Sequence, residues 1–367
     1  MPVINHRELE TLVTAIFERA GAPLGHAQKV AKHLVESNLA GHDSHGVMRV
    51  SQYVGAIKSG QLKPAAEPRI LQETTSGAVL DGQCAFGQVA AGYAMRLAMD
   101  KARETGIGAV TLRDCYHSGR LAAYSELAVH EEMIGIVMVN AGGGGQSVAP
   151  FGGSSPRLAT NPISIASPPA DPFPLVLDIA TSVAPEGKIR DYLHRGQSLP
   201  EGWIVDSEGR PSTDPQDLYG PLGGALLPFG GPIGYKGFGL AMMIDILAGA
   251  LSGAGACNED LVPARDGILV MALDVAQYSL IEDFHRHVLR LVEHVKSCPT
   301  APGCEEVCVP GELEHRAAKR MRQSGVPIPD QTWREITSIA EKLEVSQPAH
   351  PTDDGHQPRM HVPAAGS

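Results

Sequence analysis

The sequence Gly41-His42-Asp43-Ser44-His45-Gly46-Val47-Met48-Arg49 combines helix-capping residues with ionisable side chains. Asp43 or Ser44 can cap a helix, because a side-chain oxygen there accepts from the free N–H groups of the first turn. After them, apolar residues recur at the spacing of one helical face, namely Val47, Val50, Val54 and Ile57. Gly60 then suits the position just beyond a helix end. The stretch therefore predicts a helix over about residues 44–59.

His45 and Arg49 lie four residues apart, so the predicted helix presents them on one face. An Arg can hold a carboxylate with two parallel hydrogen bonds, and a His can transfer a proton near neutral pH. The helix dipole also favours negative charge at this end. The pair suits a small, proton-exchanging anion, although a solvent-exposed turn with a capping Asp and a surface Arg would leave the same pattern.

The composition of the chain limits its partners. It has 367 residues, a net charge of -11 and a hydrophobic fraction of 43%, which allow two or three domains with a large core. An acidic chain without a basic cluster argues against nucleic acid or an anionic membrane as the main partner. The longest apolar stretch, residues 238–251, contains Asp245 and is too short to span a membrane. The polar N-terminus has no apolar signal region.

The six cysteines are scattered at positions 84, 115, 257, 298, 304 and 308. This distribution is typical of a soluble cytoplasmic protein with reduced thiols. Cys298, Cys304 and Cys308 lie near His294 and His315, but their spacing is looser than that of a zinc site. We therefore expect free thiols in a loop and no bound metal.

Hydrophobic periodicity divides the chain into helical ends and a strand-rich middle. Helices are predicted over residues 6–21, 25–40, 86–104, 120–132, 237–251, 280–296, 312–324 and 331–343. Strands are predicted over residues 70–80, 106–112, 134–140, 163–166, 175–179 and 267–273. Strands that alternate with helices favour a layered α/β architecture. Residues 185–228 are predicted to be a loop-rich insert, and residues 346–367 a disordered tail.

The glycine-rich segments do not match the common nucleotide-binding loops. No Gly-x-Gly-x-x-Gly motif joins a strand to a helix, and a Walker A lysine motif is absent. Residues 142–145 follow a predicted strand, but the residues after them do not open a helix. The sequence therefore does not support a Rossmann phosphate loop, and a nucleotide would have to bind through another arrangement of glycine-rich loops.

Beyond residues 41–46, further motifs follow in a fixed order at residues 117–120, 148–153, 160–162, 178–182, 187–190, 236–240 and 310–312. In this order and spacing they resemble the type 2 malate/L-lactate dehydrogenases, a non-Rossmann family of NAD(P)-dependent oxidoreductases. The resemblance runs from about residue 8 to residue 343. Residues 40–45 and 85–90 look most like the hydroxycarboxylate dehydrogenase branch.

The resemblance implies a mixed α/β nucleotide-binding domain with a fold of its own over residues 69–278. It also implies a helical domain built from residues 1–68 and 279–345, and a homodimer whose active site lies between domains. The implied activity interconverts a small 2-hydroxy acid and its 2-oxo acid with NAD or NADP. Two alternatives stay open, namely a reductase of a cyclic imine carboxylate and a non-catalytic dimeric binding protein on the same scaffold.

Hydride transfer at such a site requires a group that exchanges the hydroxyl proton, a cation that holds the carboxylate, and a site that brings the two carbons close. In the family, His45 and His117 match the positions that line the site, and we favour His45 over His117 for proton transfer. Arg49 would hold the substrate carboxylate. Ser44 would orient His45 or the substrate oxygen, unless it only caps a helix.

The resemblance also implies a set of cofactor-binding residues. They are His45, Gly119, Arg120, Leu121, Asn161, Pro162, Leu177, Asp178, Ile179, Ala180, Thr181, Tyr235, Lys236, Gly237, Pro310, Gly311, Glu312 and Leu313. The missing side chain of Gly119 would let the backbone approach a phosphate, and Arg120 would supply positive charge. Asp178 could alternatively fix a histidine or be a buried, hydrogen-bonded carboxylate. Glu312 could accept from ribose hydroxyls or cap the helix that follows it.

The chain departs from the family pattern at three places. Asp114-Cys115 stands where Asn-Ser is frequent, Tyr235 stands where His is frequent, and Val270 occupies a strand position where some relatives have a polar residue. Asp114 would add negative charge near the cofactor phosphates or the substrate carboxylate. Tyr235 can hydrogen-bond and stack but does not titrate near pH 7. These departures bear on the substrate and on the choice between NAD and NADP.

Overall fold

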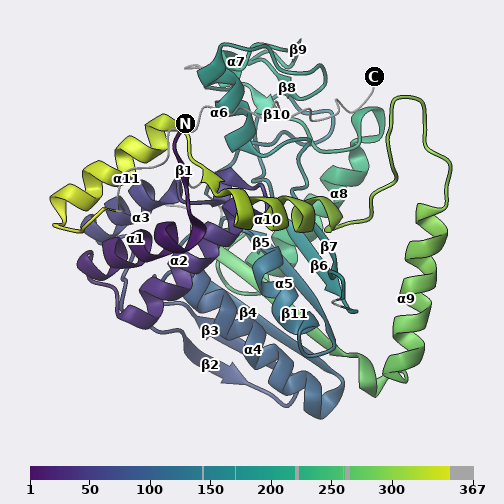
Figure 1. Cartoon of the computed structure of the whole chain (residues 1–367). Coiled ribbons are helices and arrows are strands. Elements are labelled where there is room, and N and C mark those ends of the chain that lie inside the picture. The colour runs from purple at the N-terminus through teal and green to yellow at the C-terminus, as the bar shows by residue number, and fades with distance from the viewer. Residues whose placement is uncertain (143, 170, 220–222, 259, 261–264, 348–367) are drawn as a thin grey trace.

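The computed structural model describes residues 1–142, 144–169, 171–219, 223–258, 260 and 265–347. Over these residues, a helical layer built from both chain ends lies beside a central sheet that is itself covered by helices (Figure 1). The predicted mixed α/β class is therefore confirmed. Most of the tail predicted to be disordered, and Gly143 of the glycine-rich segment, lie outside the described residues.

Seven strands form the central sheet in the order β2-β3-β4-β11-β5-β6-β7. Their bounds are β2 Arg69–Glu73, β3 Gly77–Asp81, β4 Ile107–Cys115, β5 Met133–Asn140, β6 Ile163–Ser167, β7 Leu175–Ile179 and β11 Asp266–Asp274. The pair β3 and β4 is parallel, and the other neighbours are antiparallel. The single strand predicted over residues 70–80 is wrong, because the chain turns after β2 and the Thr74 N–H donates to the Gly77 carbonyl at 2.8 Å.

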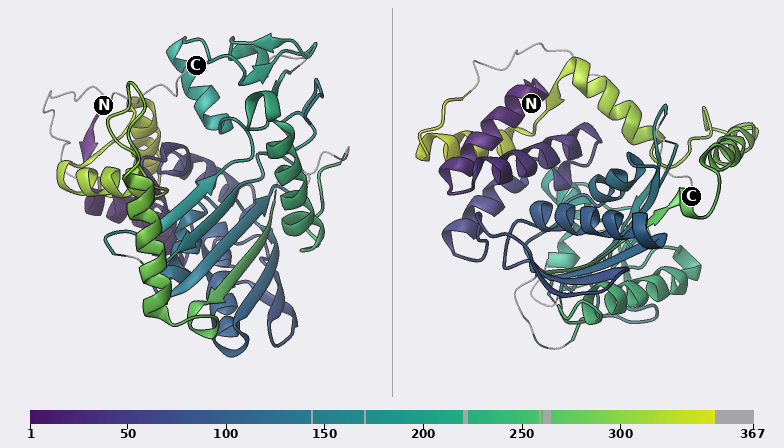
Figure 2. Two further views of the ribbon diagram at one scale, coloured as in Figure 1. Left: turned by 90° about the vertical axis from the view of Figure 1, so that its right-hand side faces the viewer. Right: turned by 90° about the horizontal axis from the view of Figure 1, so that it is seen from below.

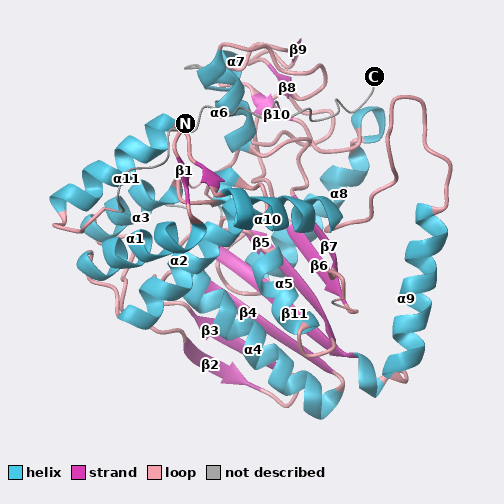
Figure 3. Cartoon of the chain, viewed as in Figure 1, coloured by secondary structure: helices cyan, strands magenta, loops and turns pink. Residues whose placement is uncertain are grey.

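The described helices are α1 His6–Arg19, α2 Leu24–Leu39, α3 Arg49–Lys58, α4 Gly87–Thr105, α5 Ala122–Val129, α6 Glu186–Arg195, α7 Gln216–Tyr219, α8 Tyr235–Ile244, α9 Ile281–Lys296, α10 Glu312–Ser324 and α11 Asp330–Lys342. The shorter elements are β1 Val3–Ile4, η1 Asp43–His45, β8 Ile204–Val205, β9 Pro211–Ser212, β10 Ala225–Leu226, η2 Gly231–Ile233, η3 Asp245–Ala250, η4 Val275–Gln277 and β12 Val326–Pro327. Figure 3 shows the helices around the strands of the sheet. None of the described helices has the length and hydrophobicity that crossing a bilayer requires.

Both faces of the sheet are covered, because side chains along a strand alternate between its two faces. On β5, Val137 and Val139 pack into the cluster formed with α4 and α5. Met138, between them, packs with residues of α8 and η3. The sheet therefore lies between a helical layer of α4 and α5 and a second layer of α8 and η3, as Figure 2 shows from two further directions.

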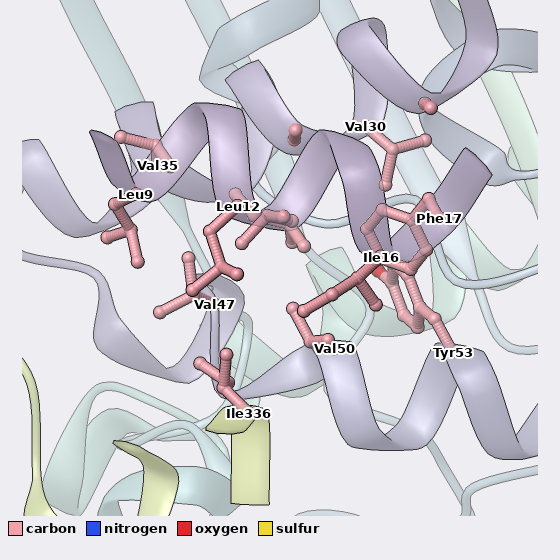
Figure 4. Close-up of a cluster of buried hydrophobic side chains, with 14 of the residues drawn as sticks. Leu9, Leu12, Ile16, Phe17, Val30, Val35, Val47, Val50, Tyr53 and Ile336 are labelled. Carbon is pink, nitrogen blue, oxygen red and sulfur yellow. The ribbon is translucent and has the colours of Figure 1, made fainter. Parts of the chain in front are cut away.

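The helical layer beside the sheet brings together the two ends of the chain. Apolar side chains of α1, α2, α3 and α11 point toward one another in one buried cluster, to which Leu12, Phe17, Tyr53 and Ile336 belong (Figure 4). Each fully buried side chain of this size stabilises the fold by roughly 1.5–3 kcal/mol. Strand β1 also pairs antiparallel with β12, so the N-terminus is fastened to a segment more than three hundred residues later.

Helix α9 lies apart from this layer. It contains no buried residue, and it stands outside the body of the molecule in Figure 1 and in the right panel of Figure 2. The sequence assigned it to the helical domain together with α10 and α11, of which α11 contributes Ile336 and Ala340 to the cluster. The domain boundaries at residues 68, 278 and 345 stay a prediction.

The helix predicted over residues 44–59 is wrong at its beginning. Residues Asp43–His45 form a 3-10 turn, and α3 starts only at Arg49, without a side-chain cap. The reason is Asn38 of α2, which donates to Asp43 Oδ1 at 2.6 Å and accepts from the Val47 N–H at 2.8 Å. Gly46 lies so close that a Cβ there would be 2.3 Å from Asn38 Oδ1. Packing on α2 thus separates His45 from the helix that carries Arg49.

The insert over residues 185–228 is more ordered than predicted. It contains α6, α7 and a small sheet in the order β10-β8-β9. Its own apolar cluster includes Ile189, Leu199 and Ile204, so the Gly- and Pro-rich turns connect short elements that pack together. The helix predicted over residues 237–251 is α8, which continues as the π-helix η3.

Candidate active site

Three ionisable side chains from separate parts of the chain meet next to the helical layer. His45 lies on η1, Arg49 begins α3, and His117 lies in the loop after β4. The rings of His45 and His117 are nearly parallel, at an interplanar angle of 18° and with centroids 5.7 Å apart. The Arg49 guanidinium is near enough to lower the pKa of both imidazoles. The structure therefore brings the two imidazoles and the guanidinium together.

Tyr53 and Gln88 form a buried hydrogen-bonded chain that holds His117 on the Nδ1 side of its ring. The hydroxyl of Tyr53 lies 2.8 Å from His117 Nδ1 and 3.4 Å from the His117 carbonyl. The same hydroxyl accepts a hydrogen bond of 2.8 Å from Gln88 Nε2 on α4. Because Nδ1 is occupied by Tyr53, Nε2 is the ring atom of His117 that remains for a ligand.

His45 and Arg49 are connected through Ser44. The Ser44 hydroxyl lies 2.9 Å from His45 Nδ1, so Ser44 orients His45 and does not cap a helix. Arg49 Nε donates to the Ser44 carbonyl at 2.7 Å, and Nη1 donates to Gln52 Oε1 at 2.7 Å. Over the described residues no carboxylate pairs with Arg49. A guanidinium held by neutral groups is suited to bind an external carboxylate.

The electrostatic environment keeps both imidazoles neutral. Burial, followed by the charge of Arg49, lowers the pKa of His45 to about 3. The pKa of His117 is lowered well below its ordinary value, by burial first and then by Arg49 and the other two imidazoles nearby. A neutral imidazole has a free lone pair on one nitrogen, so at neutral pH this site is equipped to accept a proton.

A third histidine, His33 on α2, belongs to the site although the sequence interpretation did not single it out. Its Nε2 accepts a hydrogen bond of 3.0 Å from the Arg120 backbone N–H, and its ring stacks on Tyr124 with centroids 5.5 Å apart. Burial, followed by Arg120, lowers its pKa to about 3. The sequence signal for His33 is a histidine on the buried face of an amphipathic helix. Histidines at such positions are more often structural than functional.

Gly119 serves His33 in this structure. Its φ of 76° is in the left-handed region, and a Cβ there would lie 2.3 Å from His33 Nε2. The glycine therefore permits close approach of a buried imidazole, where the sequence suggested approach of a phosphate. The neighbouring residue Arg120 pairs with Glu126 at 3.3 Å, and its buried Nε has no partner among the described residues.

A pocket of about 170 Å³ lies beside this loop, between α2, α5, β7 and α10. Of the predicted cofactor-binding residues, Arg120, Asp178 and Gly311 line it. Its wall combines the apolar side chains of Phe173 and Val176 with the Arg120 cation. The donor set fits part of a dinucleotide, because the unpaired Arg120 Nε is a donor for a phosphate oxygen and the apolar wall suits a base or a ribose.

Asp178 has a local partner of its own. Its Oδ2 accepts from the Ala122 backbone N–H at 2.8 Å, at the first turn of α5, and burial raises the pKa of its carboxyl. No hydrogen bond joins it to a histidine within the described part of the chain, so the structure favours the interpretation as a buried, hydrogen-bonded carboxylate. Its position still places it in the wall of the pocket.

Several other predicted cofactor-binding residues point into the protein. Asn161 donates to the Ala241 carbonyl at 3.0 Å and to Asp245 at 3.2 Å. Thr181 donates to the Thr160 carbonyl at 2.8 Å. The Glu312 carboxylate accepts from Lys296 at 2.5 Å, from Arg316 at 2.5 Å and from the Val309 N–H at 3.2 Å. Glu312 thus joins α9 to α10, because Lys296 and Arg316 both donate to its Oε1 and the Val309 N–H donates to its Oε2.

The residues at the start of α8 lie elsewhere. Tyr235 is exposed with its ring on Phe151, Lys236 is exposed, and a Cβ on Gly237 would lie 2.5 Å from the Phe229 carbonyl. None of them lines the pocket within this chain, nor do Leu121, Pro162, Leu177, Ile179, Ala180, Pro310 and Leu313. The predicted cofactor set is therefore brought together only in part.

The departures from the family pattern have separate surroundings. Asp114 has a φ of 57° and lies 3.9 Å from Arg113 Nε, outside the pocket lining. Cys115 and Val270 are fully buried in the sheet. Asp114, which was expected to add negative charge near the cofactor phosphates or the substrate carboxylate, does not line the pocket. Among the described residues, no three His, Cys, Asp or Glu side chains are grouped as metal ligands.

Comparisons with known proteins show which sequences and folds this chain is similar to. The sequence profile of the malate/L-lactate dehydrogenases matches residues 4–337. A malate dehydrogenase of Pyrococcus horikoshii is 36% identical over 92% of this chain and 94% of its own length. The hydroxycarboxylate dehydrogenase B of Escherichia coli O157:H7 is 35% identical over 91% and 92%. Among solved structures, malate dehydrogenase from Entamoeba histolytica superposes with a TM-score of 0.90 at 29% identity, over 95% and 99% of the two chains.

Proposed function

Because the chain belongs to the malate/L-lactate dehydrogenase family, we propose that it interconverts a 2-hydroxy acid and its 2-oxo acid with NAD or NADP. The observation that carries the proposal is the meeting of His45, His117 and an Arg49 that no described carboxylate pairs with. When bound, the nicotinamide cofactor supplies the hydride chemistry. The residues of this chain bind and orient the acid and move its proton.

His117 is the proton-transfer group in this proposal, in place of His45 as the sequence suggested. The Tyr53 oxygen accepts from Gln88 and from His117 Nδ1–H, and its own hydrogen goes to the His117 carbonyl. This arrangement leaves the Nε2 lone pair free to take the hydroxyl proton of a 2-hydroxy acid. His45 has only the hydroxyl of Ser44 at Nδ1, a less rigid support, and we assign it to orienting the acid and the cofactor.

Arg49 binds the carboxylate and also sets the strength of the base. Its charge is the second cause, after burial, of the low pKa of His117. A carboxylate beside Arg49 cancels this charge, so the pKa of His117 rises when the acid binds. The base is therefore strengthened in the complex, where the hydroxyl proton has to be removed.

The cofactor would be held by Arg120 of the loop after β4, by Asp178 of β7 and by Gly311, which all line the pocket. Arg120 is the cation of this group and offers its unpaired Nε to a phosphate. The described cations of the pocket also face carboxylates, since Arg120 pairs with Glu126 and Arg322 with Glu36. Whether NAD or NADP is used is decided by comparing the two cofactors in one assay.

The proposed assembly is a homodimer. Helix α9 carries the exposed apolar residues Leu289, Leu291 and Val295, and α8 with η3 carries the exposed residues Met243 and Ile246. Helix α9 lies on the side that faces the viewer in the left panel of Figure 2. An amphipathic helix without buried residues requires a partner to cover its apolar side. Light scattering on the purified protein should give twice 38.7 kDa, and a monomer would contradict this part of the proposal.

We place the protein in the cytoplasm. All six cysteines are unpaired in the structure, and three of them, Cys84, Cys257 and Cys308, are only partly buried. Free, accessible thiols persist in a reducing compartment. Fractionation of cells that produce the protein would test the location, and recovery of the protein from a secreted fraction would contradict it.

The test of the activity is a steady-state screen. Oxidation of NADH and of NADPH is followed with a series of 2-oxo acids, including oxaloacetate, pyruvate, sulfopyruvate and aromatic members, and with cyclic imine carboxylates. We expect turnover with at least one 2-oxo acid. Turnover confined to cyclic imines would transfer the proposal to a reductase of those substrates. No turnover with any of them, together with binding of the cofactor, would identify a binding protein on this scaffold.

A further inference from the structure

Asp266 is a buried carboxylate for which neither the family resemblance nor the proposed mechanism has a role. It is the first residue of β11 and lies opposite Cys115, the last residue of β4. The register shifts between Asp266 and Ile268, so the strand begins with an irregularity. Such irregularities re-aim a side chain relative to the regular pleat. Only 7% of Asp266 is exposed, which makes an ionised carboxylate there costly unless it is hydrogen-bonded.

The partner of Asp266 is Ser118, the residue that follows His117. Asp266 Oδ2 accepts from the Ser118 backbone N–H at 2.8 Å and from the Ser118 hydroxyl at 2.7 Å. The carbonyl of Ser118 accepts from the Tyr124 hydroxyl. All three polar groups of Ser118 are therefore held by side chains of other elements. A residue fastened in this way cannot rotate without breaking two bonds to a charged group.

The loop around His117 has little room to compensate for a loss of this anchor. Gly87, at the start of α4, lies so close that a Cβ there would be 2.4 Å from the Tyr116 carbonyl and 2.6 Å from the His117 carbonyl. The imidazole itself is held at Nδ1 by Tyr53. The direction of His117 Nε2 thus depends on two supports, Tyr53 at the ring and Asp266 at the backbone.

We propose that Asp266 is a positioning residue whose carboxylate, through Ser118, fixes His117 for proton transfer. The proposal rests on the proposed function, because it assigns His117 to the proton step. Asp266 touches neither the imidazole nor the ligand site, and it acts only through the backbone of the loop. Loss of its charge should therefore lower kcat more than it raises KM for the acid, which Arg49 binds.

The titratable groups packed around Asp266 do not change their charge in the pH range where Asp266 titrates. Cys115 of β4, Tyr53 of α3 and Tyr124 of α5 are the titratable groups packed around it, and the pKa of each is raised by burial, so all three are neutral at and below pH 7. The preceding residue, Arg265, contacts Cys84, and Arg113 and Asp114, which come just before Cys115 on β4, pair with each other at 3.9 Å.

The geometry is supported by the ionisation of the carboxyl. Burial raises the pKa of Asp266 to about 6, against the effect of its hydrogen bonds from Ser118. Since His45 titrates at about 3 and His117 well below its ordinary value, neither imidazole of the free protein loses its lone pair near pH 6. An acid limb near pH 6 in kcat/KM is therefore assigned to Asp266.

Asp266→Asn is the deciding variant, because it keeps the shape and one acceptor oxygen but has no charge. Two charge-assisted bonds become neutral ones, which should lower kcat about tenfold at pH 7.5 with KM for the acid changed less than about twofold. The wild type should lose activity as the pH falls through about 6, and the variant should lack this limb. Ser118→Ala, which removes only the hydroxyl bond, should fall between the two.

A matched control is Glu73→Gln, which removes the carboxylate charge from a buried cation, Lys101, on another part of the sheet. It should keep the wild-type kcat and the acid limb, even if its stability decreases. A second readout needs no turnover. In the apo protein with isotope-labelled histidine, the ring signals of His117 should shift between pH 7.5 and 5 in the wild type and stay fixed in Asp266→Asn.

The outcomes separate the two proposals. If Asp266→Asn retains both the wild-type kcat and the acid limb, or if the His117 signals move in the variant as in the wild type, Asp266 has no positioning role. If the wild type turns over no 2-oxo acid while the His117 signals behave as expected, the proposed function fails and the coupling between Asp266 and His117 remains.

Discussion

Replacing Tyr53 with Phe tests the support behind His117 most directly. The Tyr53 side chain is fully buried, and its ring packs against Phe17 and Phe86 at centroid distances of 6.2 Å each. Phe keeps this packing and removes only the hydroxyl. Tyr53 then no longer accepts the two hydrogen bonds of 2.8 Å, one from His117 Nδ1–H and one from Gln88 Nε2, and no longer donates to the His117 carbonyl at 3.4 Å.

The magnitude follows from these two bonds. Gln88 is 5% exposed and its Oε1 already has no partner among the described residues, so its whole amide becomes unpaired in the variant. We expect a loss of about 1–3 kcal/mol in the free energy of unfolding. Loss of the bond that sets the His117 ring and its tautomer, worth about 1–2 kcal/mol, should lower kcat about 5- to 30-fold. KM for the acid should change little, because Arg49 is not touched.

The assay combines urea unfolding with steady-state kinetics on Tyr53→Phe and on Tyr53→Phe/Gln88→Leu. The double variant replaces both polar partners with apolar groups, so it should regain most of the stability but none of the turnover. The reasoning is refuted if Tyr53→Phe loses stability while kcat stays within twofold of the wild type. That result would reduce Tyr53 to a packing residue and leave His117 without a defined tautomer.

Four further predictions concern the groups around the two imidazoles. His117→Ala should lower turnover about 10²–10⁴-fold, and His45→Ala by less. Both variants should retain nicotinamide binding in a fluorescence titration. Turnover equal to that of the wild type in both variants would remove the two residues from the mechanism. Arg49→Met should raise KM for the acid at least about tenfold, as expected when a charged hydrogen bond is lost, and steady-state titration with the acid checks this. Gly119→Ala should destabilise the protein by more than about 1 kcal/mol, because φ is 76° and the new Cβ meets His33 Nε2; an unchanged urea midpoint would show that His33 can move. The pKa of His33 is lowered from 6.5 to about 3, so the unfolded chain takes up a proton that the folded chain does not, and stability should fall as the pH decreases from about 6.5 toward 3. In His33→Gln this slope should be smaller by up to about 1.4 kcal/mol per pH unit, measured by urea unfolding at several pH values.

Periodic patterns predicted the elements whose buried side is set by their own sequence. The helices over residues 6–21 and 25–40 correspond to α1 and α2, since each has one apolar face against a core. The strand over residues 134–140 corresponds to β5, which is apolar on both faces. The helix over residues 44–59 failed at its start because Asn38 supplies bonds that no local pattern contains. The capping residues at positions 43 and 44 therefore do not mark a helix start.

The sequence indicates the reactive groups of the candidate site but not the residues that hold them in place. His45, His117 and Arg49 have side chains whose chemistry is visible in the sequence. Tyr53 and His117 are 64 residues apart, Tyr53 and Gln88 are 35 apart, and Ser118 and Asp266 are 148 apart. Tyr53 and Gln88 sit in apolar surroundings where the sequence pattern indicates only core, and Asp266 precedes an apolar strand as any turn residue would. Only tertiary contacts assign them to His117.

The charge of Arg49, which no described carboxylate pairs with, connects the stability of this site to its chemistry. A guanidinium without a carboxylate partner, beside imidazoles that burial keeps neutral, destabilises the folded state relative to an ion pair at the same place. A permanent carboxylate would remove that cost, but it would occupy the site and raise the pKa of His117 before the acid arrives. Leaving the partner to the ligand makes the proton acceptor stronger only when the acid is bound. The low pKa of His117 in the free protein is therefore the condition under which binding of an anion can activate the base.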